Sequence, residues 1–504
     1  MAAIFRTTIK YSFGRPVWRN STNTVKLHPL ALEKPTTIEE MKACVTRAIR
    51  DKLRIRATGP GHSFSDAPYT EDLLVDTSAL TAITPKYLGD EHLIEVEAGV
   101  TVSGLNKELD ALGKSIRAMG GYNKQSIAGA IQTGTHGSSL KFGAMSAMVR
   151  SVVLVTRDME HRDRAHTYRI EAANGPTPIS PSPASGPTLI KDDHLFHSVV
   201  VSFGAMGLLH SLVVEVEPFY CLKEVRRVSN WTDVKQELRD GLLEAHGSVL
   251  IQINPYLPGE DTALIITHDR VPDDQVPSAL RRRGADLGYF FSALWGAIRN
   301  PSLLVAGHFR LTYWIMVLMI NMRPERIGRT FRSAIRSQRD DGYTHRAHKV
   351  MYQGAAHFKL RAYDTECAIP LRLGDYLATL DALIAHLRDM NDTYRSHLSA
   401  PIGLRFVKGS PLFLTPEHGH EVCYVDLPVL KHAYGHSNIV GRLQEFFRDP
   451  QHMGIPHWGK RNERFTAADI EARYPRLNDW KKARDRFDKE RTFANRFTER
   501  LVGV

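Results

Sequence analysis

Two glycine-rich loops contain the residues whose types and spacing best suit the binding of an anionic ligand. The first loop, ATGPGHSFSDAP (57–68), places His62 and Ser63 directly after Gly59 and Gly61. Glycine adopts positive φ readily and has no Cβ, so the backbone N–H groups of such a loop can approach and hold a phosphate. The same pattern is typical of a surface turn between strands. His62 is therefore open to three interpretations: a turn residue, a general base or an attachment point.

The second loop, SIAGAIQTGTHGSS (126–139), favours a pyrophosphate site. Its glycines, hydroxyl residues and histidine include Ser126, Gly129, Thr133, Gly134, Thr135, His136 and Gly137. The hydroxyls can donate hydrogen bonds to phosphate oxygens, and the glycines allow close approach of the backbone. A Rossmann dinucleotide site needs G-x-G-x-x-G, and the first loop lacks the third glycine. The two loops therefore predict a pyrophosphate site of another kind.

The elements around these loops are those of an α+β protein. A helix is predicted over 36–50, because a threonine cap and two glutamates precede apolar residues at helical spacing. A Pro/Ser/Gly-rich segment, 174–187, predicts an exposed loop, and a domain boundary is expected near residue 222, where the pattern becomes less regular. The predicted strands are β-branched runs bounded by turn residues: 53–59, 73–78, 93–100, 148–156 and 208–218.

Length, charge and cysteine content bound the class of protein. The 504 residues exceed the size at which a single core stops growing, so two or more domains are expected. The 66 basic and 55 acidic residues give a net charge of +11, which favours anionic ligands without choosing among nucleotide, nucleic acid and lipid. The cysteines lie far apart and predict neither a disulfide framework nor a zinc site: Cys44, Cys221, Cys367 and Cys423.

Two further segments bear on location. Residues 1–32 contain five basic residues and no acidic one, a composition typical of a mitochondrial presequence, so cytoplasmic, membrane-peripheral and mitochondrial locations all stay open. The apolar runs 287–298 and 311–322 are too short to span a bilayer, and 323–341 carries six arginines. These segments fit either helices of a second domain or a surface that binds an anionic membrane.

The motifs of the first 218 residues and of the last third occur together in one known family. In order they are GHSFSD, LIEVEAGVTVSGLNKEL, SIAGAIQTGTHGSS, SFGAMGLLHSLVVEVEP, TECAIP, LRFVKGSPLFLTP, PHWGK and FANRF. The chain resembles the sugar-lactone and alditol oxidase branch of the vanillyl-alcohol oxidase flavoprotein family. Residues 222–345 resemble the family only in apolar character.

The resemblance implies a PCMH-type FAD-binding fold with a substrate cap domain. It places the FAD domain at 1–221, the cap at 222–460 and a C-terminal segment, 461–504, that returns to the FAD domain. It also implies that His62 is joined covalently to the flavin. The other residues expected to hold FAD are Gly59, Gly61, Ser63, Ser126, Gly129, Gly134, Thr135, His136 and Gly137. His136 is expected to pack beside the pyrophosphate.

The same resemblance implies the catalytic residues. Lys460 and Arg405 are expected to stabilise charge at the flavin and the substrate. The family has a glutamate two residues before this arginine, on the same face of a strand, but here that position is Gly403. We therefore expect a space without a carboxylate beside an unpaired arginine, and a substrate that is bulkier or less hydroxylated than a sugar lactone. Candidate replacements for the glutamate are Glu366, His418 and His420.

The implied reaction is oxidation of a CH–OH group by hydride transfer to flavin N5. The partners are a small-molecule alcohol and oxygen or another electron acceptor, and neither a metal nor a nucleic acid is implied. Tyr122 is bulkier than the residue usual beside the flavin, so oxidase and dehydrogenase activities both stay open. One alternative is a flavin-binding protein that has lost catalysis. Another is an NTPase, because GIPHWGK (454–460) begins like a Walker A loop, although Arg461 stands where Ser or Thr should bind magnesium.

Overall fold

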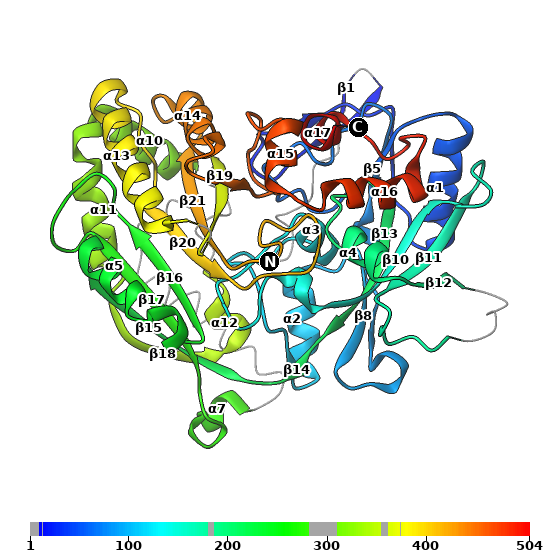
Figure 1. Cartoon of the computed structure of the whole chain (residues 1–504), viewed down its shortest axis with the longest axis horizontal. Coiled ribbons are helices and arrows are strands. Elements are labelled where there is room, and N and C mark those ends of the chain that lie inside the picture. Colours follow the sequence, from blue (N-terminus) through cyan, green and yellow to red (C-terminus); the bar gives the residue numbers. More distant parts are fainter. Residues whose placement is uncertain are drawn as a thin grey trace.

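The two halves of the chain each form a large β-sheet, and the two sheets lie side by side (Figure 1). The structure is a computed structural model that describes residues 10–12, 14–179, 186–281, 310–353, 361–372 and 374–503. The expected apolar run 287–298 lies outside these residues. Among the described helices, none combines the length and hydropathy needed to cross a bilayer.

A small parallel sheet carries the first glycine-rich loop. It has the order β4 (Ala31–Glu33), β6 (Leu73–Asp76), β5 (Ile55–Thr58), and the loop begins where β5 ends. Helix α1 (Ile38–Arg50) shares a buried core with this sheet. The hydroxyl of Thr37 caps the helix by accepting a hydrogen bond from Glu40 N at 3.2 Å. The helix predicted over 36–50 is confirmed, with the threonine cap just before its first turn.

A six-stranded sheet completes the first half. Its order is β12 (Thr188–Lys191), β11 (Ala165–Glu171), β10 (Val149–Arg157), β13 (Leu208–Glu215), β8 (Leu93–Glu97), β7 (Ile83–Pro85). The accompanying helices are α2 (Val102–Ala111), α3 (Ile127–Gln132) and α4 (Asp193–Val199). All five predicted strands are present. The shorter strands are β1 (Lys10–Ser12), β2 (Arg15–Arg19), β3 (Lys26–Leu27), β9 (Lys114–Ser115) and β14 (Glu217–Pro218).

The structure also bears on the basic N-terminal stretch, 1–32, and on the predicted loop, 174–187. Within the basic N-terminal stretch, Trp18 of β2 and Leu27 of β3 are buried, so residues 15–27 belong to the fold. In the predicted loop 174–187, Ile179 is exposed, while residues 180–185 lie outside the described part of the chain.

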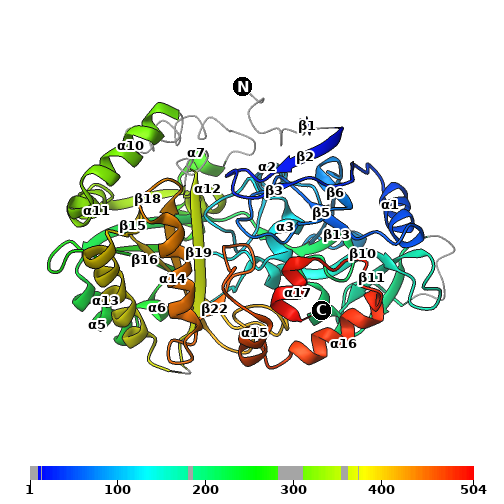
Figure 2. The ribbon, with the colours of Figure 1, turned by 90° about the horizontal axis from the view of Figure 1, so that it is seen from above.

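The second half is built on an eight-stranded sheet whose neighbouring strands all pair antiparallel. Its order is β18 (Asp340–Arg346), β15 (Cys221–Ser229), β17 (Ala263–Arg270), β16 (Ser248–Ile253), β20 (Ile402–Val407), β21 (Val422–Leu430), β19 (Ala362–Pro370), β22 (Ile455–Pro456). The helices of this half are α5 (Trp231–Arg239), α6 (Leu242–Ala245), α7 (Ser278–Arg281), α10 (Arg310–Met322), α11 (Ile327–Arg336), α12 (Ala347–Met351), α13 (Tyr376–Tyr394) and α14 (His436–Arg448). Figure 2 shows α10 and α11 at the end of this half.

The C-terminal segment returns to the first half, where α16 and α17 lie beside its strands (Figure 1). It consists of α15 (Ala467–Arg473), α16 (Leu477–Asp488) and α17 (Arg496–Val502). Phe493 enters the core of the small parallel sheet. Arg56 on β5 is buried and donates hydrogen bonds to the carbonyl oxygens of Phe493 (2.7 Å), Gly204 (3.0 Å) and Ala67 (2.7 and 3.1 Å), and also to that of Phe203. Strand β5 and the C-terminal segment are therefore joined by a buried hydrogen bond.

Candidate active site

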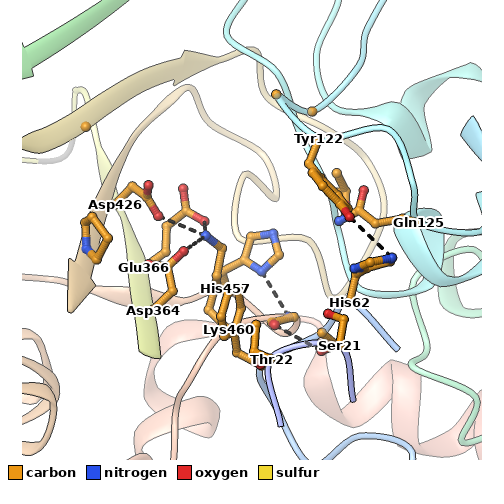
Figure 3. A pocket seen from close by; sticks show the side chains of 18 of the residues that line it. Ser21, Thr22, His62, Tyr122, Gln125, Asp364, Glu366, Asp426, His457 and Lys460 are labelled. Atoms are coloured by element: carbon orange, nitrogen blue, oxygen red, sulfur yellow. Dashed lines mark hydrogen bonds and ion pairs between the residues drawn. The ribbon is translucent and has the colours of Figure 1, made fainter. Parts of the chain in front are cut away.

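A cavity of about 1020 Å³ brings together residues from both halves of the chain. The two glycine-rich loops line one part of it, and the eight-stranded sheet and Lys460 line another. Figure 3 shows His62 and Tyr122 on one side and the side chains around Lys460 on the other. This is the arrangement expected when one domain binds a cofactor and a second covers it.

The first loop is shaped by its glycines in two ways. Gly61 has a φ of +70°, as expected for glycine, whereas Gly59 does not have a positive φ. A Cβ on Gly59 would instead lie 2.5 Å from Ser126 Oγ of the second loop. Gly61 therefore uses the positive φ that glycine allows, whereas Gly59 is needed for its lack of a Cβ where the two loops touch. Ser63 Oγ donates to Gly459 O at 3.0 Å, which ties this loop to the segment of Lys460.

His62 lies in the cavity beside Tyr122. Their rings form an edge contact with centroids 4.7 Å apart, and Tyr122 Oη is 3.5 Å from His62 Nε2. Burial, aided by the positive charge of Lys124, lowers the pKa of His62 to about 4. The imidazole is therefore neutral near pH 7, which is the form of histidine that can act as a nucleophile.

The second loop contributes the start of α3. Ser126 caps this helix and accepts a hydrogen bond from Gly129 N at 3.3 Å. Of the expected cofactor-binding residues, Gly59, Gly61, His62, Ser63, Ser126, Gly129, Thr135 and His136 line the cavity. The lining of the cavity formed by the described chain does not include Gly134 and Gly137. Gly137 is required for packing, because a Cβ there would lie 2.8 Å from Met119 O.

The residues present fit FAD. Much of this part of the cavity wall is backbone, since Gly120, Gly121, Gly204 and Gly207 line it in addition to the loop glycines. Gln125 also lines the cavity, and its Oε1 is buried without a hydrogen-bond partner among the described residues. A buried acceptor of this kind calls for a donor from a ligand.

Lys460 lies within a group of three carboxylates (Figure 3). Its Nζ contacts Asp364 and lies 2.9 Å from Asp426 Oδ1 and 3.4 Å from Glu366 Oε2. Burial alone would lower the pKa of Lys460, but the three carboxylates outweigh it and hold this pKa well above its usual value. Burial and the neighbouring Asp426 raise the pKa of Asp364 well above its usual value. For Glu366, Lys460 and His136 outweigh burial and hold the pKa well below its usual value. Lys460 and Glu366 are therefore both ionised.

Glu366 also belongs to a buried group with two histidines. The donor atoms of His136, Glu366 and His457 all lie within 4.8 Å of one another, a spacing that suits a metal ion. Both histidines already have hydrogen-bond partners, however: His136 Nε2 lies 3.3 Å from Glu366 Oε1, and His457 Nδ1 accepts from Gly459 N at 2.9 Å. The nearby ammonium of Lys460 also opposes a second cation. The group acts as a hydrogen-bonded support for Glu366.

His136 therefore stands at the carboxylate group. Its ring stacks on Tyr424 with centroids 3.5 Å apart, and both side chains are buried. The sequence led us to expect this histidine beside a pyrophosphate, whereas its contacts are with Glu366 and Tyr424. It orients the acid that Lys460 neutralises.

Strand register explains how the polar wall of the cavity is assembled. Gln252, Gly403, Asp426 and Glu366 are successive cross-strand partners on β16, β20, β21 and β19, and all four line the cavity. The expectation that Gly403 leaves the site without a carboxylate is therefore wrong, because Asp426 stands directly beside it. Arg405 also lines the cavity and is paired, since its Nη2 donates to Gln353 Oε1 at 2.8 Å.

The remaining expected residues lie elsewhere. In the described structure His418 and His420 do not line the cavity, and His418 Nδ1 hydrogen-bonds to Leu412 O at 2.9 Å. The GIPHWGK segment is no phosphate loop: Trp458 is buried with its Nε1 donating to Leu414 O at 2.6 Å. The next helix, α15, begins only at Ala467, so the segment lacks the helix N-terminus of a Walker A motif. The NTPase interpretation is wrong.

Asp364 and Asp426 were not identified as site residues from the sequence. Asp364 lies two residues before Glu366 on the same strand, so the period-two rule would have placed it on the same face. Asp426 could not have been found in this way, because its place beside Gly403 depends on the pairing of β20 with β21.

Comparisons with known proteins agree with this geometry. Residues 29–163 match the family described as FAD binding domain, and residues 214–501 match that described as D-arabinono-1,4-lactone oxidase. The chain is 25% identical over 496 residues to L-gulono-1,4-lactone dehydrogenase of Mycobacterium tuberculosis, covering 97% of this chain and 99% of the relative. It is 22% identical over 505 residues to L-gulonolactone oxidase of Scyliorhinus torazame, covering 98% of each.

A solved structure has the same fold. The cholesterol oxidase from B. sterolicum superimposes with a TM-score of 0.73 at 14% identity, and the match covers 96% of each chain. The α+β class, the PCMH-type fold and the FAD cofactor expected from the motifs are thereby confirmed. The chain belongs to the D-arabinono-1,4-lactone oxidase family and is an FAD-dependent oxidoreductase.

Proposed function

We propose that the protein oxidises the CH–OH group of a sugar lactone or of a polyol-like alcohol that binds at the carboxylates around Lys460. The observation that carries this proposal is the cluster itself: three carboxylates and one ammonium at the wall of the FAD cavity. Carboxylates accept charge-assisted hydrogen bonds from hydroxyl groups. The relatives named for L-gulono-1,4-lactone support the same substrate class.

The exposed fractions of the three carboxylates suggest their roles. The side chain of Asp426 is 27% exposed, against 11% for Asp364 and 4% for Glu366. Asp426 is therefore the carboxylate that can accept a hydrogen bond from a substrate hydroxyl. Asp364, Asp426 and Glu366 together hold Lys460 in its charged form. Lys460 and Arg405 provide positive charge where negative charge develops during the reaction.

The cofactor would lie against the two glycine-rich loops, held by the lining residues named above. When bound, FAD accepts the hydride that leaves the substrate carbon. The hydroxyl proton passes to a carboxylate of the cluster or to solvent. We also propose that His62 forms a covalent bond to the flavin, a role supported by its neutral state and its place in the cavity.

The test is anaerobic mixing of the purified flavoprotein with gulono-, galactono- and arabinono-1,4-lactone, xylitol and a set of apolar alcohols. Bleaching of the flavin absorbance by a lactone or polyol is the expected result. A flavin that stays oxidised with every compound would contradict the proposal and favour a binding protein without catalysis. Repeating the reaction in air separates an oxidase, which reoxidises rapidly, from a dehydrogenase, which needs another acceptor.

The division of the chain into 1–221, 222–460 and 461–504 remains our proposal for the domains. It is supported by the sheet of the second half, whose first strand begins at Cys221 and whose last ends at Pro456. Limited proteolysis with mass spectrometry would test it: cuts that leave fragments with ends far from these limits would contradict the division.

We further propose that α10 rests on an anionic membrane surface. The helix exposes Trp314, Leu318 and Met322, and exposed arginines follow it, including Arg323 and Arg326. Each basic residue near such a surface contributes about 1 kcal/mol, an attraction that salt screens. The protein should sediment with phosphatidylserine vesicles in low salt and leave them in high salt. Absence from the vesicle pellet in low salt would contradict this proposal.

A further inference from the structure

The cavity extends beyond the carboxylates along the face of the eight-stranded sheet. Leu250 on β16 is the cross-strand partner of Arg405, and Ile266 on β17 is the partner of Leu250. All three residues line the cavity. On this face the row of Glu366, Asp426, Gly403 and Gln252 is mostly polar, whereas the next row contains the apolar pair Leu250 and Ile266 between Arg405 and Arg226.

Helix α11 covers this apolar end. Ile327, Thr330, Phe331 and Ala334 line the cavity at the spacing of one helix face. On the same helix Ile335 packs against Leu250, Leu264 and Ile266, which fixes α11 over the sheet. We call the part of the cavity between Leu250, Ile266, Phe331 and Ala334 the apolar arm.

Polar groups border the apolar arm. Thr330 lines the cavity beside Phe331, and its Oγ1 donates to Arg326 O at 3.2 Å. Gln338 Nε2 donates to Gln252 Oε1 and to Ala334 O, each at 3.2 Å. Arg226 is bonded to Glu224 Oε1 at 2.8 Å, while Arg326, at the start of α11, is exposed. An apolar ligand group could therefore enter without leaving a buried polar group unpaired.

We infer that the apolar arm binds an apolar substituent of the substrate. This inference rests on the proposed function: the oxidised alcohol has a hydroxylated end at Asp426 and an alkyl or aryl group that runs over Leu250 beneath α11. A substrate that filled only the carboxylate end would leave the apolar arm filled with water. An apolar substituent in the apolar arm would strengthen binding, because its surface is removed from water.

The experiment measures equilibrium binding of methyl, propyl, butyl and hexyl β-D-galactosides to the flavoprotein by calorimetry. Each added methylene should tighten binding roughly three- to fourfold until the apolar arm is full. The test variant is Ala334→Trp, which fills the apolar arm, and it should abolish the dependence on chain length. The matched control is Ser333→Trp, because Ser333 is the exposed neighbour on the same helix and does not line the cavity. The affinity of Ser333→Trp should still depend on chain length.

The outcomes separate the inference from the proposed function. Equal affinities across the series, no binding of any member, or equal loss in both variants would overturn the inference. Flavin bleaching by a lactone together with equal affinities would retain the proposed function and remove only the apolar arm. If binding depends on chain length but no lactone or polyol bleaches the flavin, the apolar arm would be retained and the proposed function contradicted.

Discussion

Gly403 and Asp426 face each other across β20 and β21, and a Cβ on Gly403 would lie 3.4 Å from Asp426 Cβ and 3.7 Å from its Oδ2. The glycine thus leaves open the space into which the aspartate carboxylate faces. A long acidic side chain at position 403 would crowd Asp426 with a second negative charge. The site therefore obtains its carboxylate from the neighbouring strand.

Replacing Asp426 should weaken the site without unfolding the protein. In Asp426→Asn the substrate hydroxyl loses a charged acceptor, and hydrogen bonds to charged groups contribute ~1.5–3 kcal/mol, so flavin reduction by a responsive lactone should slow about 10- to 100-fold. Stopped-flow absorbance measures this rate. Asp341→Asn is the control, because Asp341 is 91% exposed. Equal rates in Asp426→Asn and the parent protein would remove Asp426 from the substrate site.

Lys460 and Arg405 should differ in their effect on stability. Lys460→Met leaves three carboxylates without their buried cation, so it should lower the free energy of unfolding by about 3–5 kcal/mol and slow flavin reduction more than 100-fold. Arg405→Ala should slow the reaction similarly with a smaller loss of stability, because Arg405 donates its hydrogen bond to the neutral Gln353. Thermal unfolding and stopped-flow rates check both. Lys107→Met, at an exposed position on α2, is the control; a Lys460→Met protein as stable as this control would contradict the ion-pair assignment.

The attachment of the flavin can be tested at His62. The yellow colour should stay with the denatured polypeptide and should be released into the filtrate from His62→Ala, because that variant lacks the only imidazole proposed to form the bond. Absorbance of the filtrate after denaturation and ultrafiltration gives the answer. His161→Ala, at an exposed site outside the cavity lining, should behave as the parent protein does. Complete release of flavin from the parent protein would refute covalent attachment while leaving FAD binding intact.

His457 should make stability fall in mild acid. Burial lowers its pKa from 6.5 to about 3, and its Nδ1 must stay unprotonated to accept from Gly459 N. Between pH 6.5 and about pH 3, His457 is protonated in the unfolded chain but not in the folded protein. The contribution of His457 to the free energy of unfolding therefore decreases as the pH falls from 6.5 towards 3. His457→Gln should flatten this dependence in urea titrations at several pH values. The exposed control His92→Gln should leave the slope as it is in the parent protein. Parallel curves for His457→Gln and the parent would contradict the assignment.

Arg56 should be among the residues most sensitive to substitution. Arg56→Met would leave four carbonyl oxygens in the interior without this donor, at a cost of about 1–3 kcal/mol for each that finds no replacement. Chemical denaturation should show a loss of at least about 3 kcal/mol. Arg50→Met, whose side chain is 69% exposed, should change stability by less than about 0.5 kcal/mol. Similar effects in both variants would show that the carbonyl cluster contributes little.

Local signals in the sequence were sufficient to predict many of the helices and strands of the first half. The cap at Thr37 and the β-branched runs predicted α1 and the strands, because capping and period-two patterns depend only on neighbours in the chain. Glu366, Arg405 and Lys460 came from the resemblance of their motifs to a known family, and the structure brings all three into one cavity.

What could not be predicted depends on contacts between distant segments. The place of Asp426 beside Gly403 is set by register, which a one-residue shift would change for the whole strand. The need for glycine at position 59 comes from Ser126 in another loop. The partners of Arg56 come from residues 67, 203, 204 and 493, which no local pattern connects.

The hydrogen bond between Arg56 and Phe493 also constrains how the polypeptide is made. Phe493 belongs to the core of the small parallel sheet but follows Arg56 by 437 residues in the chain, so it is synthesised long after the strands that it packs against. The nascent first half therefore exposes an incomplete core until Phe493 has been made, a state prone to aggregation. We expect a chain truncated before Phe493 to give less soluble protein, because the core of the small parallel sheet then stays open.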